Sequence, residues 1–183
     1  FNHNGQFFKL SINNILNQFI DFARGFEDEP RVPVNLGKLL KEIQTKHTRM
    51  GQNFLLKKKN IRIDIPKKLF IDLRSLAFQR CLDNLINNAF FYSKGRVILE
   101  ATLYEESLTI DIIDDGPGIP EEDKAKLLEP FARVDKARGN KGGSGLGLTI
   151  ADRIVKAHDG KLELTNRTEG GLSAKITIPI ITA

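Results

Sequence analysis

The sequence contains a single cysteine, Cys81, and no apolar run that approaches the length of a membrane span. One cysteine excludes both an internal disulfide framework and a zinc site built from several cysteines. Because Cys81 lies beside Leu82 in a helical pattern, we expect a small buried side chain and not a nucleophile. No signal peptide is visible either. We therefore expect a soluble protein suited to a reducing compartment, and the start at Phe1 without a methionine suggests a piece of a longer chain.

Charge of one sign does not dominate the sequence. The net charge is +5, and basic and acidic residues are mixed along the chain. There is no basic stripe interleaved with aromatic residues, which argues against a nucleic-acid partner. The small surplus can still attract an anionic ligand. The densest basic run, Lys57–Asn60, lies between two strand-like stretches, and we expect it to form a solvated hairpin tip.

The chain divides near its first prolines. From Phe8 to Phe22, apolar residues recur every three or four positions, which predicts an amphipathic helix that must pack against something. Glu27–Pro33 then breaks this pattern with acidic residues and two prolines, as linkers do. A chain of 183 residues can hold one domain with a real core and an appendage. We therefore assign residues 1–30 to the helix and linker, and residues 31–183 to one domain.

The remaining sequence alternates between two hydrophobic periods. A period near 3.6 predicts four helices, at Leu36–Lys46, Leu73–Phe91, Glu121–Leu128 and Leu146–His158. Gly160 is expected to close the last helix at its C-terminal cap. Strands are predicted at Phe54–Leu56, Ile61–Ile65, Arg96–Leu103, Ser107–Ile113, Lys161–Asn166 and Leu172–Ile178. Antiparallel strand pairs interrupted by helices predict an α+β two-layer sandwich with the helices on one face of the sheet.

Three asparagines fall within one turn of the second of these helices. Asn84 and Asn88 are four residues apart and share a face, and Asn87 lies between them. A side-chain amide oxygen is a suitable ligand for Mg²⁺. Asparagine is a poor helix former, so three in one turn cost stability. The alternative is that they only decorate an exposed helix surface.

Two later segments are rich in glycine. Asp114 ends a predicted strand and is followed by Gly116 and Gly118, so a fixed carboxylate could accept a hydrogen bond from an amine while the glycines let a flat ring approach. An acidic turn is the plainer alternative. Gly143, Gly145 and Gly147 precede a helix, whose first N–H groups can bind phosphate. No Gly-Lys-Ser/Thr follows, so this is not a P-loop. The alternative is a flexible hinge before the helix, and a hinge is compatible with phosphate binding.

These segments occur in a fixed order: Asn84–Ala89, Asp114–Ile119, Pro130–Phe131 and Gly143–Leu148. In this order they resemble the N, G1, F and G2 boxes of the ATP-binding domain of bacterial sensor histidine kinases. That family is part of the wider ATPase group that includes gyrase and Hsp90. The resemblance extends over roughly Val32 to Pro179 and implies the Bergerat-type ATP-binding fold, with ATP and Mg²⁺ as cofactors.

The resemblance also implies roles for individual residues. Asn88 matches the Mg²⁺ ligand, and Asn84 matches an asparagine that lines the phosphate site. Asp114 matches the carboxylate that recognises adenine N6. The expected nucleotide contacts are Asn84, Asn88, Tyr92, Asp114, Gly116, Gly118, Ile119, Phe131, Lys141, Gly143, Gly145, Leu146, Gly147 and Leu148.

The stretch before the last glycines matches a lid over ATP. Arg133 and Arg138 match positions where related kinases have phosphate-contacting arginines, and with Asn84 they are the candidate catalytic residues. A basic loop can equally be only solvated. Phe131 is expected to anchor one edge of the lid in the core. One departure is Phe91, where the family usually has a lysine or arginine that reaches a phosphate.

Asn84 also separates branches of the ATPase group. Gyrase, Hsp90 and the serine-kinase relatives have a glutamate there that acts as a general base, and an amide cannot take a proton. Asn84 therefore argues against efficient hydrolysis of water and favours an acceptor that is already a good nucleophile, such as a neutral imidazole. The acceptor would then lie on another part of the parent protein.

The first helix, Ile15–Arg24, looks like the end of the second dimerisation helix of the EnvZ-type osmosensor kinases. The phosphoacceptor box of that family is absent, and His3, His47 and His158 are expected to be surface histidines. The resemblance implies three partners: the protein's own dimerisation domain, a response regulator, and a second copy in the parent homodimer. The parent would be an inner-membrane sensor with this part in the cytoplasm. The alternative function is a regulatory module that binds ATP without transferring phosphate.

Overall fold

The computed structural model describes residues 20, 26, 28–53, 59–61, 69–104, 106–132 and 144–180. The elements follow in the order β1 (Val32–Asn35), α2 (Leu36–Asn53), β2 (Lys59–Ile61), β3 (Phe70–Leu73), α3 (Ser75–Tyr92), β4 (Val97–Tyr104), β5 (Ser107–Asp114), the 3-10 turns η1 (Glu121–Asp123) and η2 (Lys126–Leu128), α4 (Gly147–Lys156), β6 (Lys161–Asn166) and β7 (Leu172–Pro179). Within these ranges, no helix has the length and apolar content needed to cross a bilayer. The predicted strand Phe54–Leu56 lies outside the described residues, as does the predicted helix Phe8–Phe22 apart from Ile20.

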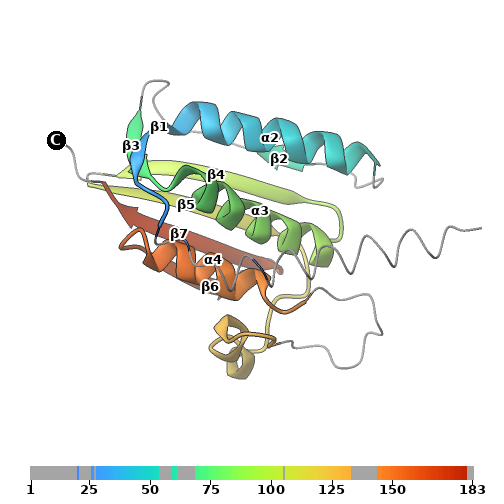
Figure 1. The fold of residues 1–183 in the computed structure, drawn as a ribbon. Helices are drawn as coiled ribbons and strands as arrows, with labels where there is room; N and C mark the ends of the chain where they lie inside the picture. The colour runs from blue at the N-terminus through green and yellow to red at the C-terminus, as the bar shows by residue number, and fades with distance from the viewer. Residues whose placement is uncertain are drawn as a thin grey trace, which may run out of the picture.

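Five strands form the main sheet, in the order β2-β4-β5-β7-β6. Neighbouring strands are antiparallel except β2 and β4, which are parallel. Figure 1 shows α2, α3 and α4 across one face of this sheet, with α3 in the middle. The predicted α+β two-layer sandwich is therefore confirmed.

The core lies between these helices and the sheet. In β5 the alternate residues Leu108, Ile110 and Ile112 are buried, which is the period of two expected for a strand with one covered face. Phe78 and Leu85 belong to the buried stripe of α3, which packs on β5. Each such side chain removed from water stabilises the fold by about 1.5–3 kcal/mol.

Cys81 belongs to this core, as expected. Its Sγ lies 3.7 Å from the carbonyl oxygen of Ala151 on α4. Burial raises the pKa of the Cys81 thiol far above its usual value, and the nearby Asp152 carboxylate raises it further. The thiol therefore stays protonated and packs as a small apolar group.

A second, two-stranded sheet was not predicted. β1 pairs antiparallel with β3, so that Val32 lies opposite Leu73 and Pro33 opposite Asp72. The assignment of Val32 and Pro33 to a linker was therefore wrong, and so was the start of a helix at Leu73, because α3 begins at Ser75. A proline is tolerated here because both strands of a two-stranded sheet are edges.

The hairpin tip predicted for the basic run was also wrong. Lys59 and Asn60 belong to β2, which pairs in parallel with Val97 and Ile98 of β4. A parallel partner is distant in sequence, so a local pattern of charge does not reveal it.

Three predicted helix boundaries differ from the structure. α2 continues past Lys46 to Asn53, and the predicted helix Glu121–Leu128 is two separate 3-10 turns. α4 ends at Lys156, and the left-handed residue after it is Asp159, with φ of 58°, and not Gly160. Gly160 donates its N–H to the carbonyl of Val155 (3.0 Å). A Cβ at Gly160 would lie 2.6 Å from the carbonyl oxygen of Thr177, so a close approach to β7 requires this glycine.

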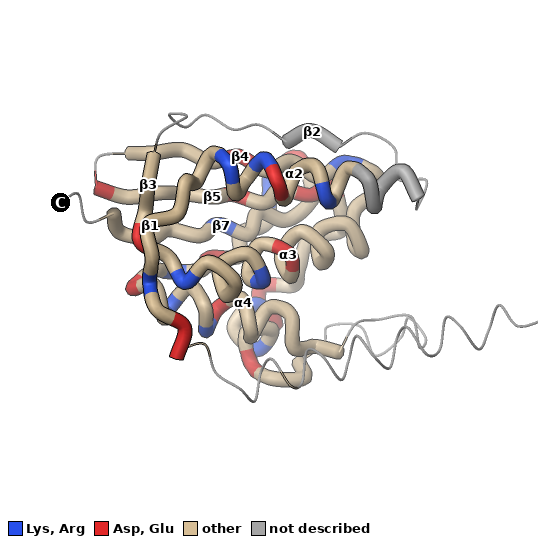
Figure 2. Tube along the Cα trace, turned by 45° about the horizontal axis from the view of Figure 1, so that its top comes forward, with Lys and Arg blue, Asp and Glu red and all other residues tan. Residues whose placement is uncertain are grey.

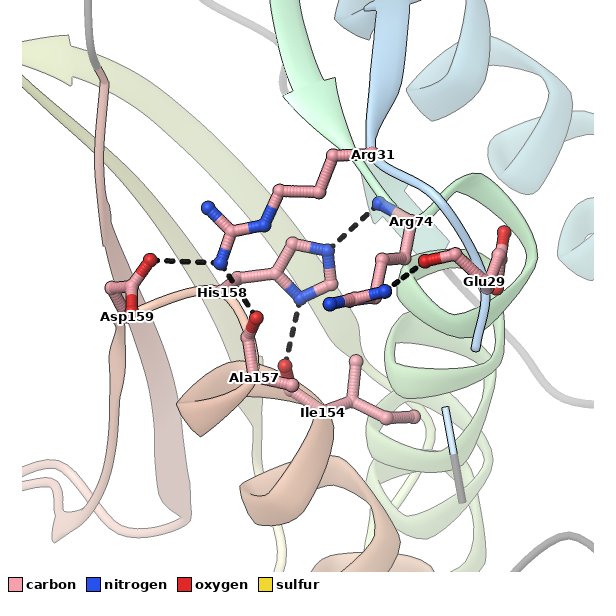
Figure 3. Close-up of polar contacts among 7 residues, drawn as sticks. All are labelled: Glu29, Arg31, Arg74, Ile154, Ala157, His158 and Asp159. Atoms are coloured by element: carbon pink, nitrogen blue, oxygen red, sulfur yellow. Dashed lines mark hydrogen bonds and ion pairs between the residues drawn. The ribbon is translucent and has the colours of Figure 1, made fainter. Parts of the chain in front are cut away.

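The expectation that His158 is a surface residue was wrong, because its side chain is only 3% exposed. Its Nε2 accepts a hydrogen bond from the N–H of Arg74 (3.0 Å), so Nδ1 carries the proton and donates to the carbonyl of Ile154 (2.7 Å; Figure 3). Burial lowers the pKa of His158 below its ordinary value. His158 is therefore a neutral residue that joins α4 to the start of α3.

His47 is also buried and not at the surface, with 1% of its side chain exposed. Its Nε2 lies 2.7 Å from Asp83 Oδ1, and Lys46 Nζ lies 2.6 Å from Asp83 Oδ2. Burial tends to raise the pKa of Asp83, but these two hydrogen bonds outweigh burial and lower it. The three side chains tie α2 to α3, and Figure 2 shows charges of both signs interspersed over these helices.

The residues ahead of β1 pack on the domain. The Glu29 carboxylate accepts hydrogen bonds from the N–H groups of Leu76 (2.7 Å) and Ala77 (3.0 Å), at the start of α3. Arg31 donates to the carbonyl of Ala157 and to Asp159 (2.7 Å each), just beyond α4 (Figure 3). A carboxylate at a helix start and a guanidinium near a helix end both complement the helix dipole.

Candidate functional site

Within the described residues, two of the predicted boxes lie along α3: the start of α4 lies beside the middle of α3, and the loop after β5 lies beside its C-terminal end. A Cβ at Gly147, the first residue of α4, would lie 3.9 Å from Asn84 Cβ on α3. A Cβ at Gly116, after β5, would lie 2.8 Å from the carbonyl oxygen of Tyr92, the last residue of α3. The structure therefore brings together three segments that the sequence places far apart.

Asp114 is the last residue of β5 and is 5% exposed. Its Oδ1 accepts hydrogen bonds from the N–H groups of Gly116 (2.8 Å) and Leu172 (3.1 Å). Burial raises the pKa of Asp114, and these two hydrogen bonds oppose that shift. Because both hydrogen bonds go to Oδ1, the carboxylate is fixed in orientation, and among the described residues none donates to Oδ2.

The loop after Asp114 is held by a residue that the sequence analysis did not select. Asn166, the last residue of β6, accepts a hydrogen bond from the N–H of Ile119 (2.8 Å) and donates one to its carbonyl (2.6 Å). Gly118 has φ of 76°, and a Cβ there would lie 2.6 Å from Asn166 Oδ1. Nothing local marks Asn166, because its partner is 47 residues away along the chain.

The same loop is also tied to the segment between α3 and β4. Asp115 Oδ1 accepts hydrogen bonds from the N–H groups of Lys94 (2.8 Å) and Arg96 (3.3 Å). Asp115 therefore ties the loop to the segment before β4, whereas both hydrogen bonds to Asp114 go to a single oxygen, Oδ1.

The side chain of Asn84 ends in a buried amide nitrogen, Nδ2. Its Nδ2 has no hydrogen-bond partner among the described residues. An unsatisfied buried donor costs about 1–3 kcal/mol, which a ligand acceptor could recover. The N-terminus of α4 lies beside it and favours an anion. Asn88, one turn along α3, is only partly buried.

Phe131, the last residue of the F box, contacts Gly145 of the G2 box. Phe131 donates its N–H to the carbonyl of Gly145 (3.1 Å). Gly145 has φ of 76°, and a Cβ there would lie 2.9 Å from the carbonyl carbon of Phe131. The backbones of the two residues that flank the predicted lid are therefore in contact.

The expectation that the Phe131 ring anchors the lid in the core was wrong. The side chain is 59% exposed, and its backbone has φ of 64°. Leu127, which is 8% exposed, is the buried side chain of this segment. Phe131 is therefore held by its backbone hydrogen bond to Gly145 and not by burial of its ring.

Some of the remaining predicted site residues are described by the structure, and the others lie outside the described residues. Leu146 is fully buried, and its N–H donates a hydrogen bond to Ser144 Oγ (3.1 Å). Leu148 packs against the core, and the ring of Tyr92 meets that of Phe91 edge to face, with centroids 4.9 Å apart. Arg133, Arg138, Lys141 and Gly143 lie outside the described residues.

Comparisons with known proteins agree on one family. A family model described as histidine kinase-, DNA gyrase B-, and HSP90-like ATPase matches residues 74–182. The sensor protein kinase WalK of Staphylococcus aureus is 43% identical over 123 residues, which cover 63% of this chain and 29% of WalK. The sensor histidine kinase CpxA of Escherichia coli is 34% identical over 105 residues, which cover 57% of this chain and 23% of CpxA. The chain therefore spans less than a third of the length of these relatives.

A solved structure extends the likeness to the fold. The histidine kinase domain of the E. coli osmosensor EnvZ matches with a TM-score of 0.62 and 29% identity, over 84% of this chain and 91% of that domain.

Proposed function

Because the chain belongs to the family of histidine kinase-, DNA gyrase B- and HSP90-like ATPases, we propose that it binds ATP with Mg²⁺ and transfers the γ-phosphoryl group to a histidine. The acceptor histidine lies on the dimerisation domain of the longer protein, a membrane-anchored sensor. From there the phosphoryl group passes to an aspartate of a response regulator. The observation that supports this most is the Asp114 carboxylate, whose Oδ1 is fixed by two backbone hydrogen bonds while Oδ2 receives none from the part of the chain that the structure describes.

Adenine binds at the end of β5. Its exocyclic amine donates a hydrogen bond to Asp114 Oδ2, and the backbone of Gly116–Ile119 forms the adjoining wall. A base with a carbonyl in place of the amine would bring two acceptors together, so guanine is disfavoured.

The phosphates lie between α3 and the start of α4. Asn84 Nδ2 supplies a donor, and the first N–H groups of α4 supply others. Asn88 is the residue that would hold Mg²⁺, which prefers oxygen ligands and neutralises phosphate charge when bound. Arg133 and Arg138 are proposed to contact the phosphates as well.

Transfer needs no general base on this chain. A neutral imidazole attacks with its own lone pair: the P–N bond forms while the bond to the ADP oxygen breaks. An asparagine at position 84 cannot activate water, so the bound ATP is preserved until the acceptor histidine arrives. Catalysis then depends on positioning and on stabilisation of charge.

The test is a mixing experiment with labelled ATP. The chain is incubated with a dimerisation domain that contains the acceptor histidine, and the products are treated with acid or base. Acid-labile, base-stable label on that histidine supports the proposal. Acid-stable labelling of the chain itself, or rapid phosphate release without an acceptor, refutes it.

A second candidate is a regulatory module that binds ATP without transferring phosphate. The observation in its favour is Phe91, an exposed phenylalanine (53%) where the family usually has a basic side chain. ATP binding together with no label on a supplied acceptor would select this candidate.

A further inference from the structure

Asn166 makes contacts that its place on the strand does not require. Its side-chain amide pairs with the Ile119 peptide through both the N–H (2.8 Å) and the carbonyl (2.6 Å), and Nδ2 also lies 3.3 Å from Glu121 Oε1. An amide has one acceptor and one donor group, and this peptide uses both. The fit leaves no room at Gly118, where a Cβ would lie 2.6 Å from Asn166 Oδ1.

The residue directly opposite Asn166 holds the other end of the same loop. Asn166 and Leu172 face each other in the antiparallel register of β6 and β7. Leu172 donates its N–H to Asp114 Oδ1 (3.1 Å), while Asn166 holds Ile119. One cross-strand pair therefore fixes the two ends of the segment Asp114–Ile119.

The hairpin that presents this pair is itself well defined. Arg167 donates its N–H to the carbonyl of Gly171 (3.0 Å), and Gly170 donates to the carbonyl of Arg167 (3.1 Å). A Cβ at Gly171 would lie 2.0 Å from the carbonyl oxygen of Asp114, so the turn packs directly on the loop. The loop cannot shift without disturbing β6 and β7.

We propose that Asn166 is a positioning residue that sets the affinity of the site for the adenine base, by holding the Asp114–Ile119 loop in its binding conformation before nucleotide arrives. The inference rests on the proposed function, in which this loop forms the base site. Preorganisation lowers the cost of ordering a loop on binding, so its loss weakens binding without changing any direct contact.

The two hydrogen bonds between the Asn166 amide and the Ile119 peptide are here called the clamp. Its removal should weaken the binding of every adenine nucleotide alike. For Asn166→Ala we expect the Kd values for ATP and ADP to rise by the same factor, roughly ten- to thirtyfold for two lost hydrogen bonds. The ratio of the two Kd values should not change, because the phosphate end is untouched. Thr165→Ala is the matched control, since Thr165 is the exposed neighbour on the same strand.

A pH profile of Asn166→Asp separates positioning from a merely structural role. The ionised carboxylate can accept from the Ile119 N–H but repels the Ile119 carbonyl, whereas the protonated form can donate to that carbonyl as the amide does. The charged groups nearby are Glu121, its partner Lys124, and Arg167. We expect the Kd ratio of variant to wild type to be largest at pH 8 and to fall toward one as the new carboxyl group protonates, near pH 5 or below.

Hydrogen exchange tests the clamp without nucleotide. The Ile119 N–H should exchange at least about tenfold faster in free Asn166→Ala than in the wild type, because its acceptor is gone. Unchanged exchange, or ATP affinity equal to wild type in both variants at all pH values, would overturn the inference. Failure of the wild type itself to bind ATP would overturn the proposed function while the exchange result still reports on the clamp.

Discussion

The substitution Asp114→Asn tests the base site with little change in shape. Asp114 Oδ1 accepts the hydrogen bonds from Gly116 and Leu172, and an amide oxygen can accept both in the same place. The amide nitrogen would then take the position of Oδ2. A donor would face the adenine amine, which is also a donor, so the contact to the base is lost while the loop is retained.

The magnitude follows from the kind of hydrogen bond. A hydrogen bond to a charged acceptor contributes about 1.5–3 kcal/mol, so the Kd for ATP should rise roughly ten- to a hundredfold. The introduced amide can donate to the guanine carbonyl, so discrimination against GTP should also decrease. Both effects follow from the reversal of one hydrogen-bond direction.

The effect on stability should have the opposite sign. The pKa of Asp114 is raised by burial, so between its unfolded and folded pKa values the folded state binds more protons than the unfolded state. Stability therefore falls as the pH rises through that window, and the ionised group costs stability above it. A neutral amide removes this cost, so the variant should melt no lower than the wild type at pH 7.

Titration calorimetry with ATP and GTP, together with thermal melting, measures both effects. Asp111→Asn is the matched control: Asp111 lies on the same strand and accepts a hydrogen bond from Ser173 Oγ (2.6 Å), which an amide oxygen can also accept. ATP titrations that coincide for wild type and Asp114→Asn would remove Asp114 from the site.

Three further predictions follow. Asn88→Ala should abolish the Mg²⁺ dependence of ATP binding and leave the circular dichroism spectrum unchanged, since Asn88 is only partly buried; equal dependence in both proteins would exclude this role. Incubated alone with labelled ATP, the chain should neither label itself stably nor hydrolyse ATP at a useful rate, because Asn84 cannot act as a base; thin-layer analysis of released phosphate measures this. Glu29→Ala should cost about 1 kcal/mol and lower the melting temperature by a few degrees, because Leu76 and Ala77 lose their acceptor. Glu122→Ala, at an exposed position, should melt like the wild type.

Local patterns predicted the central elements well. Buried residues alternate in β5 and recur with the helical period in α3, because each element has one face covered by the core. Such a pattern can be read from a single segment of sequence. The structure gives a reason for the glycine at 116, since a Cβ there would lie 2.8 Å from the carbonyl oxygen of Tyr92, whereas a Cβ at Gly147 would make only ordinary contact with Asn84. The order of these segments along the sequence then supplied the family resemblance.

Contacts between distant segments were not predictable in this way. The pairing of β1 with β3 and of β2 with β4 leaves no local period, because the strands are short and their partners lie far along the chain. His47 and His158 were misplaced because a histidine is buried only when specific partners satisfy its ring, and those partners, Asp83 and Arg74, lie on other elements. Asn166 was missed for the same reason.

The contacts of Glu29 and Arg31 also bear on where the folding unit begins. The family match starts at residue 74, yet the first turn of α3 depends on Glu29, and Phe26, at 5% exposure, lies in the core beneath Arg153. A chain cut at residue 74 would lose these contacts together with β1, α2 and β3, and would expose the apolar surface that they cover. The packed structure therefore reaches at least as far as Phe26, and the boundaries of a family match are not the boundaries at which this chain can be divided.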